Sequence, residues 1–189
     1  MNAIYQEDYK GFNIKIYQDG DAESPREVFD NFGKMVCFHN RYNLGDKTDL
    51  TIDEINEHVK RKDVVSLPLY LYDHSGITIN TTGFSCPWDS GQVGYIYADR
   101  ADILSEYGGK ILTKKLRSKI EEYLKNEVSE YDQFLRGEVY GYNVTKPVKC
   151  DSCGNVEAED IGSCWGFYGD YEGYILEEAR STVDYEVNK

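Results

Sequence analysis

The feature that most constrains the fold is a long amphipathic repeat between residues 113 and 135. Apolar side chains recur there at steps of three and four, at Leu116, Ile120, Leu124, Val128, Tyr131 and Leu135. This spacing places one apolar stripe along a helix, and the stripe must be buried against another element. Gly137 follows as a typical helix terminator. The pattern therefore predicts the longest helix of the chain.

Short runs with alternating apolar and polar residues predict the partner of this helix, a sheet. Residues 4–19 alternate on both sides of Lys10-Gly11, which indicates a hairpin. Further strands are expected at residues 35–40, 64–73, 76–82, 93–99, 137–145 and 156–162, most of them separated by turn-forming residues. The short connections favour antiparallel pairing.

Three shorter helices carry weaker signals. Ser24-Pro25 resembles a helix start, Thr51 and Glu54 have capping-box spacing, and residues 173–180 form a short apolar-polar pattern. No repeat, linker or low-complexity tract interrupts residues 1–189. We predict a single α+β domain with a mostly antiparallel sheet, one long helix and two or three shorter ones.

Charge narrows the classes of partner. The chain has 34 acidic and 21 basic residues, a net charge of −13, and residues 151–189 hold ten acids against two bases. Such a protein repels phosphate backbones, so nucleic acid is not expected as a direct partner. No apolar run has the length of a membrane span, and the first residues have no signal-peptide core, so we expect a cytoplasmic protein away from membranes. Nucleotide-binding fingerprints are missing, and no cofactor is predicted.

The glycine-rich segment 81–94 contains the side chains best suited to catalysis. Cys86 there makes an enzyme conceivable, with His74 as base and Asp73 or Asp89 orienting the imidazole. The preferred interpretation is a structural thiol and a hydrogen-bonded histidine. Trp88 is expected to be largely buried, because Pro87 restricts the chain and an exposed indole is costly.

Two cysteine-containing segments follow near the carboxyl end. Cys150 and Cys153 have the spacing of half a zinc site, but no second pair accompanies them, and a polar hairpin tip is the simpler interpretation. In the segment 163–169, Trp165 and Phe167 are both expected to pack inward. If exposed, the same aromatic group would suit a protein interface.

Three segments, LPLYLYDHSGITINTTGFSCPWDSGQVGYIY, YDQFLRGEVYGY and SCWGFYG, occur in this order between Leu67 and Gly169. Together they resemble an uncharacterised family of small proteins of bacteriophages and other mobile elements. The amino-terminal third is not covered. The resemblance transfers no catalytic residue, but it implies a setting in which small acidic proteins bind a host protein, such as a nuclease of a restriction or CRISPR system.

Our leading hypothesis is therefore an accessory protein that mimics DNA and inhibits a host defence protein, acting through an acidic, tyrosine-rich surface in the host cytoplasm. The candidate binding residues are Trp88, Asp89, Tyr168, Tyr171, Glu172, Tyr174, Glu177, Glu178 and Asp184. The alternatives are the Cys86 enzyme and a protein that sequesters a small nucleotide-like ligand. For the latter, the only basic cluster is Lys110, Lys114, Lys115, Arg117 and Lys119.

Overall fold

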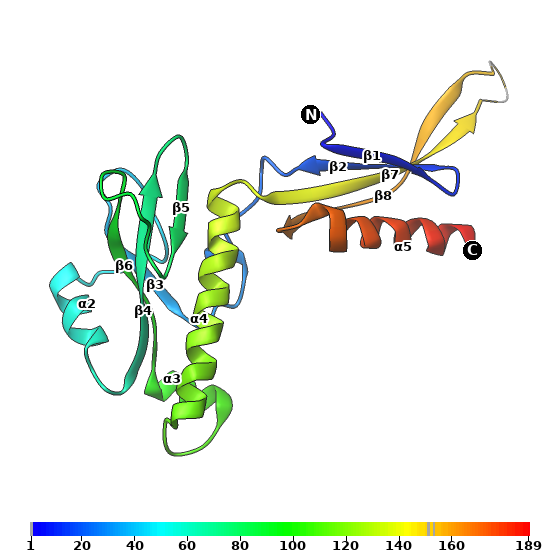
Figure 1. Cartoon of the computed structure of the whole chain (residues 1–189). Coiled ribbons are helices and arrows are strands. Elements are labelled where there is room, and N and C mark those ends of the chain that lie inside the picture. Colours follow the sequence, from blue (N-terminus) through cyan, green and yellow to red (C-terminus); the bar gives the residue numbers. More distant parts are fainter. Residues whose placement is uncertain (1, 151, 153) are drawn as a thin grey trace. The chain divides into compact units, whose positions relative to one another are not determined.

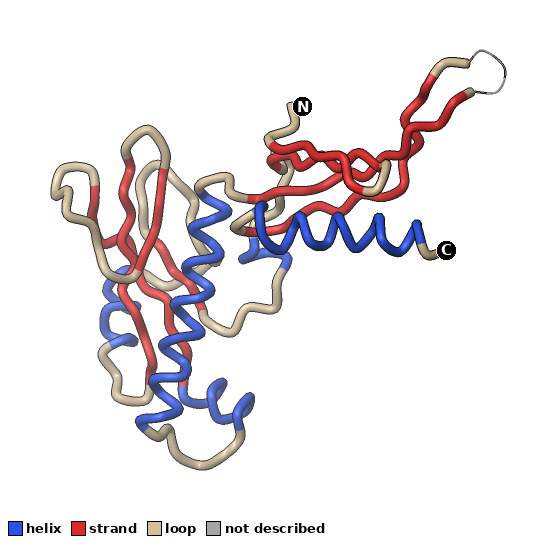
Figure 2. The backbone as a smooth tube through the Cα atoms, turned by 45° about the vertical axis from the view of Figure 1, so that its right-hand side comes forward, coloured by secondary structure: helices blue, strands red, loops and turns tan. Residues whose placement is uncertain are grey.

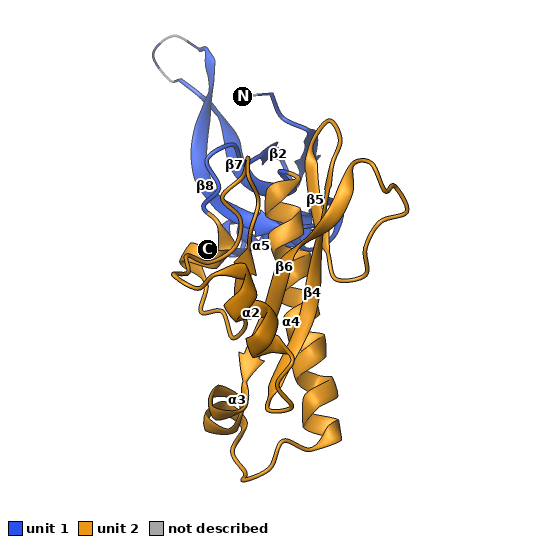
Figure 3. Cartoon of the chain, turned by 90° about the vertical axis from the view of Figure 1, so that its left-hand side faces the viewer, with its two compact units in different colours: residues 1–23, 137–189 blue, residues 24–136 orange. Residues whose placement is uncertain are grey.

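The computed structural model describes residues 2–150, 152 and 154–189. The chain divides into two compact units (Figure 3): unit 1 comprises residues 1–23 and 137–189, and unit 2 comprises residues 24–136. Each unit combines an antiparallel sheet with helices, and the predicted α+β class is confirmed. Each hydrophobic core is drawn from residues of its own unit. The single-domain organisation stays a prediction.

Unit 1 contains a four-stranded sheet in the order β1, β2, β7, β8. The strands are β1 (Tyr5–Tyr9), β2 (Phe12–Gln18), β7 (Val139–Lys149) and β8 (Val156–Tyr168). The predicted first hairpin is confirmed, with Lys10 and Gly11 at φ values of 51° and 82° in its turn. β2 pairs with β7, so that Ile14 lies opposite Val144. The two sequence pieces of unit 1 are thus joined in one sheet.

One helix covers one face of this sheet (Figure 1). It is α5 (Leu176–Val187), and a π-helical turn, η1 (Tyr171–Ile175), precedes it. Leu176, Ala179 and Val183 are buried against the apolar side of β2 and β7. A helix was expected at residues 173–180, and the observed helix extends further towards the carboxyl end.

Unit 2 is built on a second four-stranded antiparallel sheet, in the order β3, β6, β4, β5. The strands are β3 (Lys34–Cys37), β6 (Ser90–Asp99), β4 (Val64–Asp73) and β5 (Ile77–Asn80). The long helix α4 (Lys114–Leu135) lies along one face (Figure 2). Ile120, Leu124, Val128 and Tyr131 are buried in this layer. The predicted stripe of the long helix is therefore confirmed.

The remaining helices of unit 2 are short: α1 (Pro25–Val28), α2 (Ile52–Val59) and α3 (Arg100–Tyr107). α2 begins with the predicted capping box, in which Thr51 and Glu54 bond each other's backbone amides. Its Ile55 is buried with Val36 and Tyr97 in a smaller core separate from that of α4. The sequence interpretation missed α3, in which Ile103 is buried and Tyr107 packs against the α4 core.

Candidate functional site

The outward side of η1 and α5 brings together four of the predicted binding residues. Because Leu176, Ala179 and Val183 are the buried residues of α5, the positions of Glu177, Glu178 and Tyr185 lie on the opposite side of this helix. Tyr174 is 62% exposed and Tyr185 is 71% exposed. The acids on this side are Glu172 and Glu177, which are exposed, and Glu178, which is half-buried. We call these five residues the acidic helix face.

The electrostatics of the two units differ strongly. Unit 1 has 16 acidic and 6 basic residues, a net −10, whereas unit 2 has 18 acidic and 15 basic residues, a net −3. Among the described residues, no cation forms an ion pair with Glu172, Glu177 or Glu178. The negative charge of Glu178 also raises the pKa of the Tyr174 hydroxyl. The acidic helix face is therefore uncompensated negative surface with two large aromatic rings.

The other predicted binding residues of unit 1 have structural partners. Asp184 accepts a hydrogen bond from Lys10 at 2.8 Å, and this bond holds the pKa of its carboxyl below the usual value. Tyr171 packs against neighbouring tyrosine rings. The Tyr168 hydroxyl donates to the Glu23 carbonyl at 2.9 Å. These three side chains join elements within unit 1.

The prediction that Trp88 is buried is wrong, because this side chain is 91% exposed. The loop does lie on the sheet, but through other residues. The ring of Phe84 packs on Tyr72, with centroids 5.5 Å apart, and Gly83 lies against the ring of Tyr70. Phe84 thus takes the packing role that we assigned to Trp88. In unit 2, Trp88 and the neighbouring Asp89 are separate in sequence and sheet from the acidic helix face.

Residues of this loop help to line a pocket of about 510 Å³. It is lined by Tyr70, Thr82, Gly83, Phe84, Pro87, Ser90, Gly91 and Gln92. Its lining has aromatic, hydroxyl and amide groups but no charged side chain. The predicted basic cluster lies instead around the start of α4, at the other end of unit 2 (Figure 1), where Arg117 donates to the carbonyls of Lys62 and Val64. A phosphate-bearing ligand finds no cation in the lining of this pocket.

The candidate catalytic residues do not form a cysteine–histidine pair. The Cys86 thiol donates to Asp89 Oδ2 at 3.6 Å, and His74 Nδ1 lies 3.3 Å from the same oxygen. Asp73 instead accepts hydrogen bonds from Arg41 and from Tyr42, the latter at 3.2 Å. A nucleophilic thiol needs a base within hydrogen-bond reach. Here a carboxylate stands between the sulfur and the imidazole.

Cys150, the first residue of the predicted half zinc site, directly follows β7 in the connection to β8. Cys153 is outside the described residues. The Cys150 amide donates to the Asn155 carbonyl at 2.7 Å, as expected for a hairpin tip. In the part of the chain that the structure describes, no three His, Cys, Asp or Glu side chains are grouped to hold a metal ion.

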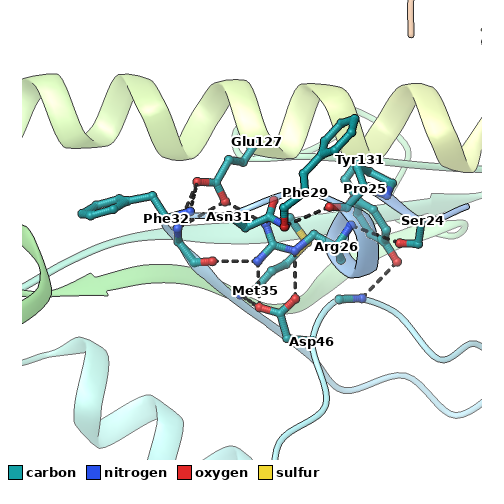
Figure 4. Close-up of polar contacts among 12 residues, drawn as sticks. Ser24, Pro25, Arg26, Phe29, Asn31, Phe32, Met35, Asp46, Glu127 and Tyr131 are labelled. Atoms are coloured by element: carbon teal, nitrogen blue, oxygen red, sulfur yellow. Dashed lines mark hydrogen bonds and ion pairs between the residues drawn. The ribbon is translucent and has the colours of Figure 1, made fainter. Parts of the chain in front are cut away.

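Arg26 is a buried charge, whose side chain is 3% exposed (Figure 4). Its guanidinium donates twice to Asp46, once to Glu127 and also to Asn31 and the Gly33 carbonyl. Burial favours loss of its proton, but these two carboxylates outweigh burial and raise the pKa of Arg26. All five N–H donors are used. This network is a structural junction of α1, β3 and α4.

The chain matches no family model, no curated protein and no solved structure. The likeness to bacteriophage and mobile-element proteins therefore stays a prediction. Among the described residues, none of the helices is both long and apolar enough to cross a membrane.

Proposed function

We propose that this protein binds a basic, nucleic-acid-handling partner through the acidic helix face of unit 1. The observation that carries the proposal is the combination of exposed Tyr174 and Tyr185 with the acids Glu172 and Glu177, which form no ion pair among the described residues, on the outward side of η1 and α5. Tyrosine supplies large, rigid contact area, and carboxylates draw a basic partner towards the surface. Tyr185, Glu172 and Glu177 are exposed, and the Tyr174 ring, although it packs edge-on against Phe167 with centroids 5.9 Å apart, is 62% exposed.

The partner in this proposal is a host defence protein, such as a restriction or CRISPR nuclease, whose groove normally holds DNA phosphates. The net charge of −10 on unit 1 supports this chemistry, since carboxylates occupy the same lysine and arginine side chains as phosphates. The choice of a defence nuclease rests on the resemblance to bacteriophage proteins. Inhibition would follow from exclusion of DNA, without any reaction on the inhibitor.

The test compares two variants with equal loss of charge. The first, Glu172→Gln/Glu177→Gln/Glu178→Gln, neutralises the acidic helix face. The matched control, Glu106→Gln/Glu121→Gln/Glu122→Gln, removes three charges from unit 2. Each is used with the wild type to capture proteins from host lysate, with double-stranded DNA as competitor.

We expect a protein that the wild type and the control retain and that DNA displaces. With that protein purified, the first variant should associate about tenfold more slowly at low salt, and the difference should shrink as salt screens the charges. If all three proteins associated at the same rate and with the same salt dependence, the acidic helix face would not be the interface.

A further inference from the structure

The sheet face of unit 1 that points away from α5 carries an aromatic platform. Tyr17 on β2 lies opposite Gly141 on β7, and Trp165 on β8 reaches across this glycine. The rings of Tyr17 and Trp165 are 6.0 Å apart at their centroids with 27° between their planes. A Cβ at Gly141 would lie only 2.2 Å from Trp165 Cε3. The indole therefore lies on the bare backbone of the sheet, and Trp165 is 43% exposed.

A β-bulge explains why Trp165 faces outward, against the prediction that it packs inward. Tyr142 pairs with Cys164 and Tyr140 pairs with Phe167, so two residues of β8 stand opposite Gly141 alone. Gly166 supplies the extra residue with a φ of 82°, which favours glycine. Phe167 returns to the α5 side, where its ring packs on Tyr142 as predicted. The bulge thus separates two aromatic residues that strict alternation would place on one face.

Polar side chains border the platform along one side of the same face. Ile14, Ile16 and Val144 are buried under α5, so the alternate residues of these strands point the other way. The row next to the rings consists of Gln6, Lys15, Asn143 and Ser163, which are paired across the four strands. Asn143 Nδ2 donates to Asp160 Oδ1 at 2.6 Å, which fixes the orientation of that amide. In the described part of unit 1, no helix covers this face (Figure 1).

We propose that this face binds an uncharged oligosaccharide. One face of a pyranose ring presents C–H groups, which pack on exposed aromatic rings, and its rim presents neighbouring hydroxyls. Amide and hydroxyl side chains beside the rings donate to and accept from such hydroxyls. A polyanion is disfavoured, because Lys15 is the only cation in the adjoining row and unit 1 has a net charge of −10. This activity is separate from the proposed function, which uses α5 on the other side of the sheet.

The test uses tryptophan fluorescence in a Trp88→Phe background, which leaves Trp165 as the only tryptophan. The probes are cellohexaose and maltohexaose, two neutral glucose hexamers with different linkages, and a dodecamer of thymidylate as a polyanion with stacking bases. We expect a saturable change with at least one hexasaccharide below roughly 10 mM, the range of a single stacking platform with few hydrogen bonds. No change with either sugar, or a saturable response to the thymidylate, would overturn the proposal.

Calorimetric titrations with variants then locate the site. Gly141→Ala keeps the indole but displaces it, and it should weaken binding about tenfold, as should Trp165→Ala, since an aromatic contact is worth about one such factor. The controls are Gly20→Ala, where an added Cβ meets open space, and Tyr185→Ala on the acidic helix face. Circular dichroism and urea midpoints check folding. Sugar affinity unchanged in Gly141→Ala and Trp165→Ala would also overturn the proposal.

Discussion

The buried guanidinium of Arg26 gives the sharpest prediction for a single residue. Arg26→Met removes five hydrogen bonds and leaves the carboxylates of Asp46 and Glu127, which are 28% and 14% exposed, without their counter-charge. Breaking one side of a buried ion pair costs about 3–5 kcal/mol. Urea unfolding should show this loss, whereas Arg61→Met, at an exposed pair with Asp63, should leave the urea midpoint nearly unchanged. Similar losses for the two variants would contradict the structural role of Arg26.

Because of Cys37, we expect the free energy of unfolding to fall at alkaline pH. Burial, aided by the charge of Asp46, raises the pKa of its thiol to about 12. Because the folded-state pKa lies above the unfolded one, the stabilisation is complete below the unfolded pKa and is lost as pH rises towards the folded value. Between roughly pH 9 and 12 the thiol should remove about 1.4 kcal/mol of unfolding free energy per pH unit.

Cys37→Ala isolates this contribution, since other buried groups titrate equally in both proteins. The variant should be less stable at neutral pH but should show a shallower decline between pH 8 and pH 10 in urea melts. Parallel declines would show that the thiol ionises as easily in the folded protein as in the unfolded chain.

The pairing of β3 with its neighbour β6 depends on one glycine of β6. A Cβ at Gly94 would lie 1.9 Å from the Val36 carbonyl oxygen, so Gly94→Ala must displace β3 from the sheet. We expect a loss of roughly 3 kcal/mol, the upper range for overpacking. Gly91→Ala on the same strand meets open space and should change stability by less than about 0.5 kcal/mol. The urea midpoints of the two variants test this difference, and equal midpoints would show that β3 does not approach Gly94 closely.

The individual helices and strands show which features can be predicted from the sequence. The α4 stripe and the capping box of α2 are local patterns, and both were predicted correctly. Trp88 and Trp165 were assigned to the interior because their size favours burial, but neighbours distant in sequence decide their environment. Phe84 occupies the place on Tyr72, and a glycine bulge turns Trp165 outward. Tyr17 was not predicted as a site residue, because its contact with Trp165 is formed between strands that are distant in sequence.

For the whole molecule, the separation of the cores predicts two kinds of fragment behaviour. Residues 24–136 contain every buried residue of the α4 and α2 cores, so this fragment should unfold cooperatively by itself. Residues 137–189 should be unfolded alone, because α5 packs on Phe12, Ile14 and Ile16 of the missing β2. Circular dichroism in a urea series measures both. A disordered 24–136 fragment would support the single-domain prediction, and two transitions in the full chain would contradict it.

The pairing of β2 with β7 also dictates an order of events on the ribosome. The β1–β2 hairpin leaves the exit tunnel before unit 2, yet its apolar side is covered by α5, which is synthesised after unit 2. All of unit 2 is synthesised in between, and domains generally fold as they emerge. During that interval Phe12, Ile14 and Ile16 form an unprotected strand, open to aggregation or to a chaperone. Vectorial synthesis therefore leaves the apolar side of the β1–β2 hairpin uncovered until α5 has been made.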